Sequence, residues 1–396
     1  MKLASRLLLF NEPETLRMAK LGRALRAEGH DIIDLSLGEP DFDTPQHIKD
    51  AAKKAIDDNW SHYTPVAGYL DLREAVCHKF KRDNNLEYKP DNIVVSTGAK
   101  QSLANAILSI VDKGDEVIIP APFWVTYAAL VQLSEGIVKV IATTLEHSYK
   151  ITPEQLDNAI TARTKLFIFS SPCNPSGAVY TKDELRALAD VFQRYPQVIV
   201  ISDEIYEYIN YKGMPESIAQ FDDMKHRTVI INGLSKGFAM TGWRLGYMSA
   251  PLEIAKACDK LQGQFTSGAN AVTQRAAITA LTSPLDATYE MVKEFARRRT
   301  RVMQLMHTIP GFEFAQPDGA FYAFPCVDSY FGKKNGEEVI KDADDLSMYL
   351  LTKAHVSTVT GSAFGNDKCL RLSYATGMGK IEEGFKRISE ALSKLK

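Results

Sequence analysis

Residues 198–206 read Val-Ile-Val-Ile-Ser-Asp-Glu-Ile-Tyr, a continuous apolar run that ends abruptly in polar side chains. Strands with one solvated face alternate apolar and polar residues, whereas strands covered on both faces of a parallel sheet are apolar throughout. The start of this stretch therefore predicts a strand inside a parallel sheet. Its polar residues Asp203, Glu204 and Tyr206 are expected where that strand ends.

Similar short apolar runs recur through the middle of the chain. They cover 93–96, 116–120, 137–141, 166–170, 228–232 and 245–249, and together with 198–202 they predict seven strands. Segments between them, such as 100–111 and 182–194, carry apolar residues at helical spacing. This alternation predicts an α/β fold in which helices sandwich a mostly parallel, seven-stranded sheet.

The last third of the chain has a different pattern. It predicts a long charged helix at 287–307, two short strands at 320–325 and 370–374, and an amphipathic helix at 380–395. We therefore expect a large domain over 45–290 and a smaller α+β domain formed by 1–44 and 291–396. The apolar run within residues 1–10 is too short for a signal peptide, so we interpret it as an N-terminal arm.

Composition limits the possible functions of the 396-residue chain. The formal net charge is −2, which argues against a general affinity for nucleic acid. No run approaches the ~20 apolar residues of a membrane span. The five cysteines are widely spaced without a C-x-x-C pattern, which argues against a disulfide framework or a zinc site and favours a reducing cytoplasm. We expect no bound metal.

Chemically useful side chains follow several of the predicted strands. In open parallel sheets, ligands bind beyond the carboxyl ends of the strands. The residues found there are Ala99 and Lys100 at a small-residue turn into a helix, Trp124, Asn174, Asp203, Tyr206, Ser235 and Lys236. Each alone has a structural explanation, such as a tight turn, core packing, a helix cap or a surface lysine. Their combination at one edge favours a ligand site.

This set matches the requirements of pyridoxal phosphate. The aldehyde of that cofactor needs a lysine amine for a Schiff base. The ring nitrogen needs a carboxylate, so that the protonated ring can accept electrons. The ring also needs an aromatic surface, and the phosphate needs backbone N–H groups with an arginine. Lys236, Asp203, Trp124 and Arg244 are residues of these types.

The stretch from Gly233 to Gly246, Gly-Leu-Ser-Lys-Gly-Phe-Ala-Met-Thr-Gly-Trp-Arg-Leu-Gly, resembles the cofactor-attachment motif of class I pyridoxal-phosphate-dependent aminotransferases, which have fold type I. Many members of that family carry serine in place of Gly233. Further motifs of the family are matched at 37–42, 62–68, 174–177, 202–206, 319–322 and 370–373. The resemblance covers nearly the whole chain and is strongest to bacterial aspartate aminotransferases.

The resemblance implies a role for each matching residue. Lys236 would hold the cofactor and move the proton at the substrate Cα, while Asp203 would pair with the ring nitrogen. Tyr206 and Asn174 would bond the phenolic oxygen, and Trp124 would stack on the ring. The phosphate would be bound by the backbone of Ala99 and Lys100, by Ser235 and Arg244, and by Tyr63 of a neighbouring subunit.

Substrate contacts are also implied. Arg371 would bind the α-carboxylate, and the strand alternation around it places Arg371 opposite Leu370 and Leu372. Gly38 would pass close to the same carboxylate, where a side chain would clash. Trp124 and Asn174 would also contact the substrate. Lys100 and Thr15 are the candidates for the side-chain carboxylate, although Lys100 is equally interpretable as a solvated lysine on a first helical turn.

The expected reaction is ping-pong amino transfer from L-aspartate to 2-oxoglutarate by a homodimer with shared active sites. The segment 264–270 and Tyr63 are expected to reach across the dimer. An aromatic or alanine aminotransferase and a carbon–sulfur lyase remain alternatives, because they share most of these motifs.

Three other classes fit the sequence less well. A serine hydrolase would use Ser235 in Gly233-Leu234-Ser235-Lys236-Gly237 with His307 or His355, but no oxyanion segment of the HGGG type is present. A dinucleotide-dependent dehydrogenase would need a G-x-G-x-x-G motif after a strand, and the sequence has none there. A cofactor-binding regulator would need an added DNA-binding module.

Overall fold

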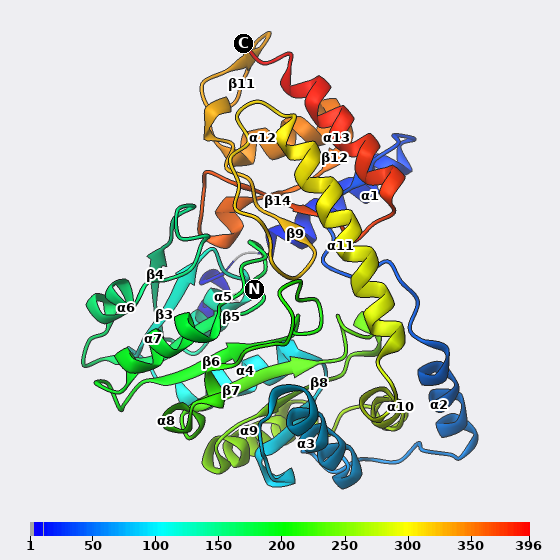
Figure 1. Cartoon of the computed structure of the whole chain (residues 1–396), viewed down its shortest axis with the longest axis vertical. Coiled ribbons are helices and arrows are strands. Elements are labelled where there is room, and N and C mark those ends of the chain that lie inside the picture. The colour runs from blue at the N-terminus through cyan, green and yellow to red at the C-terminus, as the bar shows by residue number, and fades with distance from the viewer. Residues whose placement is uncertain (1–3, 11) are drawn as a thin grey trace.

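A seven-stranded sheet forms the centre of the larger part of the protein (Figure 1). The computed structural model describes residues 4–10 and 12–396, so residues 1–3 and 11 of the predicted N-terminal arm lie outside the described part. The strands are β2 (Ile93–Ser96), β3 (Glu116–Ala121), β4 (Ile137–Ala142), β5 (Thr164–Ser170), β6 (Ile199–Asp203), β7 (Thr228–Gly233) and β8 (Gly246–Ser249). Their order is β2-β8-β7-β6-β5-β3-β4, and each predicted apolar run supplies one strand.

The sheet is mostly parallel. β8 runs antiparallel to both of its neighbours, β2 and β7, while the other pairs are parallel. Ser170, Asp203 and Ile231 lie side by side across β5, β6 and β7. The carboxyl ends of these strands therefore meet at one edge, as the apolar runs predicted.

Two apolar layers enclose the sheet, because successive residues of each strand face opposite sides. Ile201 packs with the layer under α4 (Ala99–Ile110), α5 (Thr126–Leu133) and α9 (Leu252–Phe265). Val200 packs in the opposite layer with α6 (Pro153–Ala159), α7 (Lys182–Phe192) and α8 (Asp222–Lys225). On that side, α2 (Gln46–Asp57), α3 (Leu70–Asn84) and α10 (Ala271–Thr282) cover the end of the sheet near β2. This double cover explains the continuous apolar runs.

The smaller part holds an antiparallel sheet of β13 (Val359–Thr360), β14 (Leu370–Ser373) and β9 (Tyr322–Ala323). The predicted strand at 320–325 is thus only two residues long. β1 (Ile33–Asp34) pairs in parallel with β12 (Val356–Ser357), which ties the N-terminal segment to this part. β10 (Lys334–Asn335) and β11 (Glu338–Val339) form a separate hairpin.

Four helices accompany these strands. They are α1 (Glu14–Ala27), α11 (Asp286–His307), α12 (Ala343–Tyr349) and α13 (Met378–Leu392). In Figure 1, α11 runs from beside α10 at the base to α13 at the top, so one long helix spans both parts of the molecule. The region between the two parts is where the carboxyl ends of the central strands face β9 and β14.

Candidate active site

A cavity of about 280 Å³ lies at the carboxyl ends of the central strands. It is lined by residues that the sequence singled out, namely Thr15, Gly38, Ala99, Lys100, Trp124, Asn174, Asp203, Tyr206, Ser235, Lys236, Arg244 and Arg371. Pro13, Leu16, Val125, Thr126, Tyr127, Ser170, Ile205, Thr241 and Tyr322 complete the lining. The fold therefore brings together side chains that are up to 356 positions apart, from Thr15 to Arg371.

Lys236 follows β7 and points its amine into this cavity. Its Nζ donates a hydrogen bond to the carbonyl oxygen of Gly38, and no described residue forms a salt bridge with it. Burial of the amine, together with the charges of Arg371 and Arg244, lowers the pKa of Lys236 to about 8 against an opposing effect of Glu39. A lysine of lowered pKa is a competent nucleophile near neutral pH.

Asp203 ends β6 and is almost completely buried. Its Oδ2 accepts a hydrogen bond of 2.6 Å from the Tyr127 hydroxyl, and its Oδ1 accepts one from the Ile205 amide. Burial raises the pKa of Asp203 to about 6, although these hydrogen bonds and the charge of Lys236 oppose the shift. A cationic partner in the cavity would relieve this cost and keep the carboxylate ionised.

The Tyr127 contact was not identified from the sequence. Tyr127 lies three residues beyond Trp124, and its amide donates to the Trp124 carbonyl. The two rings pack edge to face with centroids 5.7 Å apart. The position of Tyr127, three residues after Trp124 in the segment that follows β3, was the sequence signal for a second aromatic residue in the site.

Tyr206 and Tyr322 face each other across the cavity, with their hydroxyl oxygens 2.7 Å apart. Tyr322 comes from β9 of the smaller part and lies within the 319–322 motif, which by itself implied no role for this side chain. A Cβ added at Gly38 would lie 2.8 Å from the Tyr322 hydroxyl oxygen. Glycine at 38 thus allows the backbone to approach this pair of tyrosines. The clash that a side chain would make here is with Tyr322, whereas the sequence led us to expect a clash with the substrate.

Arg371 extends from β14 and is 2% exposed. One guanidinium nitrogen donates to Asn174 Oδ1 at 3.1 Å, another donates to the Ser36 carbonyl, and Nε has no partner among the described residues. The aromatic rings of Tyr322 and Phe364 lie 4.6 and 5.0 Å from its central carbon. No described carboxylate forms a salt bridge with it. A buried guanidinium without an anion is a receptor for a ligand carboxylate.

The other end of the cavity gathers positive charge at the start of α4. The amides of Ala99 and Lys100 lie in the first helical turn, where no intrahelical acceptor exists. The Arg244 guanidinium lies directly against Gly98, since a Cβ there would be 2.4 Å from its Nη2. The only hydrogen bond of this guanidinium goes to the Thr241 carbonyl among the described residues. Cation and helix N-terminus repel each other, so the pair favours an anion between them.

Lys100 lies over the Trp124 ring, with its Nζ 4.9 Å from the ring centroid. Burial, and then the charge of Arg244, lower the pKa of Lys100. Thr15, in the first turn of α1, lines the same cavity. Both candidates for the distal substrate contact therefore line the cavity. Because Lys100 is also exposed to solvent, its role as a substrate contact stays a prediction.

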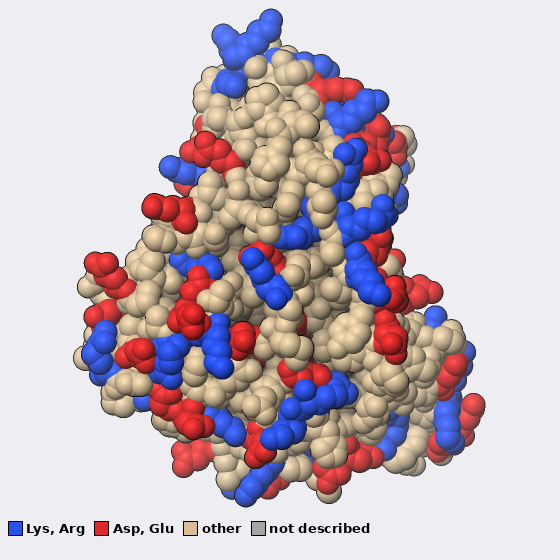
Figure 2. Space-filling model, viewed as in Figure 1, with Lys and Arg blue, Asp and Glu red and all other residues tan. Residues whose placement is uncertain are grey.

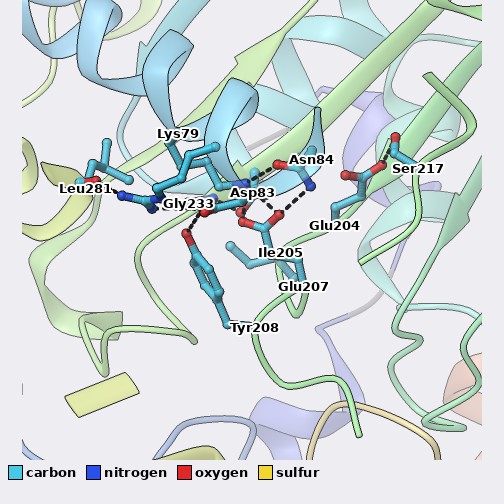
Figure 3. A network of polar contacts seen from close by, with 12 residues as sticks. Lys79, Asp83, Asn84, Glu204, Ile205, Glu207, Tyr208, Ser217, Gly233 and Leu281 are labelled. Atoms are coloured by element: carbon cyan, nitrogen blue, oxygen red, sulfur yellow. Dashed lines mark hydrogen bonds and ion pairs between the residues drawn. The ribbon is translucent and has the colours of Figure 1, made fainter. Parts of the chain in front are cut away.

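A buried polar network holds the 203–208 turn from behind (Figure 3). Lys79 of α3 donates to Glu207 Oε2 at 2.6 Å and to Asn84 Oδ1 at 2.7 Å. Glu204 accepts hydrogen bonds from the hydroxyls of Ser202 and Ser217, and burial raises its pKa to about 7. Asp203 and Tyr206 face the cavity, whereas Glu204 and Glu207 anchor the same turn to the protein.

Tyr63 and the two histidines of the hydrolase alternative lie outside the lining of the cavity. Tyr63 is 99% exposed and does not line the cavity, so any role it has requires a second molecule. The hydrolase alternative is unsupported, because neither His307 nor His355 lines the cavity that contains Ser235. Instead, His307 packs against Phe314 and His355 stacks on His30.

Other ligand types find little support in the part of the chain that the structure describes. It contains no group of three or more His, Cys, Asp or Glu side chains arranged to hold a metal ion. None of its helices combines the length and apolarity that crossing a membrane requires. On the face drawn in Figure 2, basic and acidic residues are interspersed without a large field of one sign.

Comparisons with known proteins identify the family of this chain. The family model for aminotransferase class I and II matches residues 30–388. The aspartate/prephenate aminotransferase of Nitrosomonas europaea is 43% identical over 99% of this chain and 100% of its own length. The aspartate aminotransferase of Bacillus subtilis is 42% identical over the full length of both chains.

Solved structures give the same result. The aspartate aminotransferase of Rhizobium meliloti superposes with a TM-score of 0.97, at 41% identity and complete coverage of both chains. The Thermus thermophilus aspartate aminotransferase solved with maleate has a TM-score of 0.92 at 35% identity, covering 99% of this chain and 100% of that one. Sequence, fold and site geometry therefore lead to one conclusion: this chain belongs to the aminotransferase class I and II family, whose aspartate aminotransferases use pyridoxal phosphate.

Proposed function

We propose that this enzyme transfers the amino group of L-aspartate to 2-oxoglutarate in two half-reactions, releasing oxaloacetate and then L-glutamate. The observation that carries the proposal is the charge pattern of the cavity. A lysine of lowered pKa, a buried carboxylate and a buried guanidinium face one space of about 280 Å³, and none of the three has an oppositely charged protein partner in salt-bridge contact among the described residues.

The residues present fit pyridoxal phosphate. When bound, this cofactor supplies an aldehyde that condenses with amines and a cationic ring that accepts an electron pair. Asp203 would hold the ring nitrogen proton, and Trp124 would cover the ring. Tyr206 and Asn174 would donate to the phenolic oxygen. The start of α4, with Ser235 and Arg244, would neutralise the phosphate, which explains why positive groups converge there.

Arg371 would bind the substrate α-carboxylate in a bidentate manner. Its Nε has no hydrogen-bond partner among the described residues, and Asn174 and Ser36 already fix the plane of the guanidinium. A carboxylate held there places the substrate Cα within the cavity that Lys236 lines. The Lys236 amine, of pKa about 8, would then remove and return the proton at Cα.

Lys100 and Thr15 are the proposed contacts for the second carboxylate. Support comes from the Thermus thermophilus relative, which was solved with maleate, a four-carbon dicarboxylate. Lys100→Ala should lower kcat/KM for aspartate at least tenfold more than for an aromatic amino acid. Equal losses on both donors would refute the role.

Prephenate is a second candidate acceptor, because the Nitrosomonas relative is named for it.

A homodimer with shared sites is also part of the proposal. Tyr63 is fully exposed in the single chain, and Phe265 of the 264–270 segment is 62% exposed. Aromatic side chains are enriched in the surfaces through which proteins associate. Sedimentation of the purified enzyme should give twice the chain mass, and Tyr63→Phe should weaken cofactor binding. A monomer with full activity would refute this part.

We further propose 45–290 as the large domain, and 1–44 with 291–396 as the small domain. The β1–β12 pairing supports the grouping of the N-terminal segment with the C-terminal part. Limited proteolysis tests this division, and cleavage is expected in loops beside these boundaries rather than within α11, which contains residue 290.

A spectrum of the purified protein tests the central proposal. Protein supplied with cofactor should absorb in the visible range and should lose that band when aspartate is added. In a separate sample without aspartate, borohydride should attach the cofactor at Lys236. A panel of amino donors separates aspartate from aromatic amino acids, alanine and sulfur-containing lyase substrates. A colourless protein without an adduct at Lys236 would overturn the assignment.

A further inference from the structure

We propose that Cys326 and Cys369 form an oxidisable dithiol that reacts with a hydroperoxide, such as hydrogen peroxide, and closes to a disulfide behind Arg371. The two sulfur atoms lie 3.2 Å apart in the smaller part of the molecule. Neither cysteine belongs to the cavity described above.

The backbone already has the geometry of a cross-strand disulfide. Cys326 and Cys369 face each other in an isolated antiparallel bridge. The flanking hydrogen bonds run from the Val327 amide to the Lys368 carbonyl and from the Leu370 amide to the Pro325 carbonyl. This pattern marks a non-hydrogen-bonded pair, whose Cα atoms are about 4.5 Å apart. Disulfides accept Cα separations from about 4.4 to 6.8 Å, so side-chain rotation is sufficient for closure.

The two thiols differ in exposure and hydrogen bonding. Cys326 is partly accessible to solvent, whereas Cys369 is buried. The Tyr149 hydroxyl lies 3.1 Å from the sulfur of Cys326 and 3.5 Å from that of Cys369. Donation from Cys369 and Tyr149 lowers the pKa of Cys326, although its partial burial and the nearby carboxylates of Asp328 and Glu313 oppose this. Low-pKa, accessible thiols beside a second thiol are the ones that oxidants select.

The exposure and lowered pKa of Cys326 indicate that this thiol reacts with the peroxide first. The Cys326 thiolate attacks the peroxide, the O–O bond breaks, and Cys326 becomes a sulfenic acid as hydroxide leaves. The Cys369 sulfur then displaces the sulfenic oxygen, which leaves as water with the thiol proton and the hydrogen of the sulfenic group. Two thiol groups lose two electrons in total, and one peroxide is reduced.

The pair is connected to the substrate site by close packing. Cys369 precedes β14, and Arg371 is the second residue of that strand. Cys369 shares a buried cluster with Tyr149, Phe324, Val359 and Phe364, and the Phe364 ring lies against the Arg371 guanidinium. Tyr149 enters this cluster from the segment after β4 with a left-handed backbone, φ 57°. The cluster therefore joins the large-sheet part to the strand that carries Arg371.

Closure would bring the sulfurs from 3.2 Å to about 2.05 Å and would remove the thiol donors that Tyr149 contacts. Because packed interiors transmit such shifts, the position of Arg371 should change slightly. We expect KM for the amino acid to rise three- to tenfold in the oxidised enzyme, with kcat changed less than twofold. This consequence rests on the proposed role of Arg371 in substrate binding.

The test uses the holoenzyme treated with increasing hydrogen peroxide, then alkylated under denaturing conditions and digested. Mass spectrometry should find the peptides that contain Cys326 and Cys369 joined, while Cys77, Cys173 and Cys258 are alkylated. Cys326→Ser should abolish the linkage, and Cys77→Ser, which replaces another partly exposed cysteine, should leave it intact. Absence of the linked peptides, or equal oxidation of all five cysteines, would overturn the proposed dithiol.

Kinetics test the consequence separately. KM should rise on oxidation and return after dithiothreitol in wild type and Cys77→Ser, and it should not change in Cys326→Ser. A linked pair with unchanged KM would overturn the connection to Arg371. A reduced enzyme without aspartate activity would instead refute the proposed function, while the peptide mapping would still judge the dithiol.

Discussion

Two lysines inside this protein occupy opposite electrostatic settings. Lys79 is fully buried behind the 203–208 turn, where it is paired with Glu207 and bonded to Asn84 (Figure 3). Lys236 lies on the cavity side of the same turn, and within the described part of the chain its amine donates a hydrogen bond only to the Gly38 carbonyl. The first has its counter-ion built into the protein, and the second does not. A lysine left without a carboxylate partner retains an amine that can react.

The same contrast holds for two buried arginines. Arg298 of α11 is paired with Asp41 and Glu294. Arg371 is equally buried but bonds only to an amide side chain and a carbonyl among the described residues. Buried charges are costly unless they are paired. The unpaired ones therefore mark the place where ligands supply the missing charges.

Replacing Lys236, the lysine without a carboxylate partner, should have the largest effect on activity. Lys236→Met should lower kcat by at least about 10³-fold, because both covalent attachment and proton transfer at Cα are lost. Steady-state assay with borohydride labelling measures this. Lys256→Met, on the exposed face of α9, serves as the control and should retain full activity. Substantial turnover by Lys236→Met would break the comparison.

Replacing Lys79 tests the paired side. Lys79→Met should destabilise the protein by about 3–5 kcal/mol, because it leaves Glu207 as a buried charge without its partner. The unfolding midpoint in urea measures the loss. Lys81 lies on the same helix as Lys79 and forms an exposed salt bridge with Glu87. Lys81→Met should therefore change stability by less than about 1 kcal/mol. The double variant Lys79→Met/Glu207→Leu should recover much of the loss, and failure to do so would show that the pairing is not the cause.

Arg371→Lys should raise KM for aspartate about 30-fold, equivalent to about 2 kcal/mol, because lysine keeps the charge but loses the bidentate geometry. The effect on kcat should be much smaller. The matched change Arg298→Lys should instead lower stability and leave KM near the wild-type value. Initial rates over a range of aspartate concentrations separate the two outcomes, and identical behaviour of both variants would contradict the contrast.

The smallest effect should be a gain in stability. The pKa of Lys236 is lowered to about 8 in the folded protein from an ordinary value of 10.5, so folding disfavours its charged form. This cost is fully present at pH values below 8 and disappears as pH rises through 8 to 10.5. Apoprotein carrying Lys236→Met should therefore be about 1–2 kcal/mol more stable than wild-type apoprotein at pH 7. At pH 10.5 the difference should vanish. Thermal unfolding across this pH range measures it, and a pH-independent difference would rule out the titration of Lys236 as its cause.

The residue pattern was sufficient to predict the central sheet and one edge of the site. Seven apolar runs gave seven strands, because residues covered on both faces must be apolar. The same rule placed Asp203 and Lys236 where their strands end, so local pattern alone brought them to one edge. The antiparallel direction of β8 did not follow from its composition, since a buried strand has the same residues in either direction.

Contacts between side chains of distant segments could not be predicted from the residue pattern. The contact of Tyr206 with Tyr322 joins residues 116 positions apart, and that of Lys79 with Glu207 joins residues 128 positions apart. The Cys326–Cys369 pair likewise depends on a bridge between two segments of the smaller part. Such contacts depend on how helices and sheets pack against one another. Periodicity specifies which face of an element is buried, but it does not specify the partner against which that face is buried.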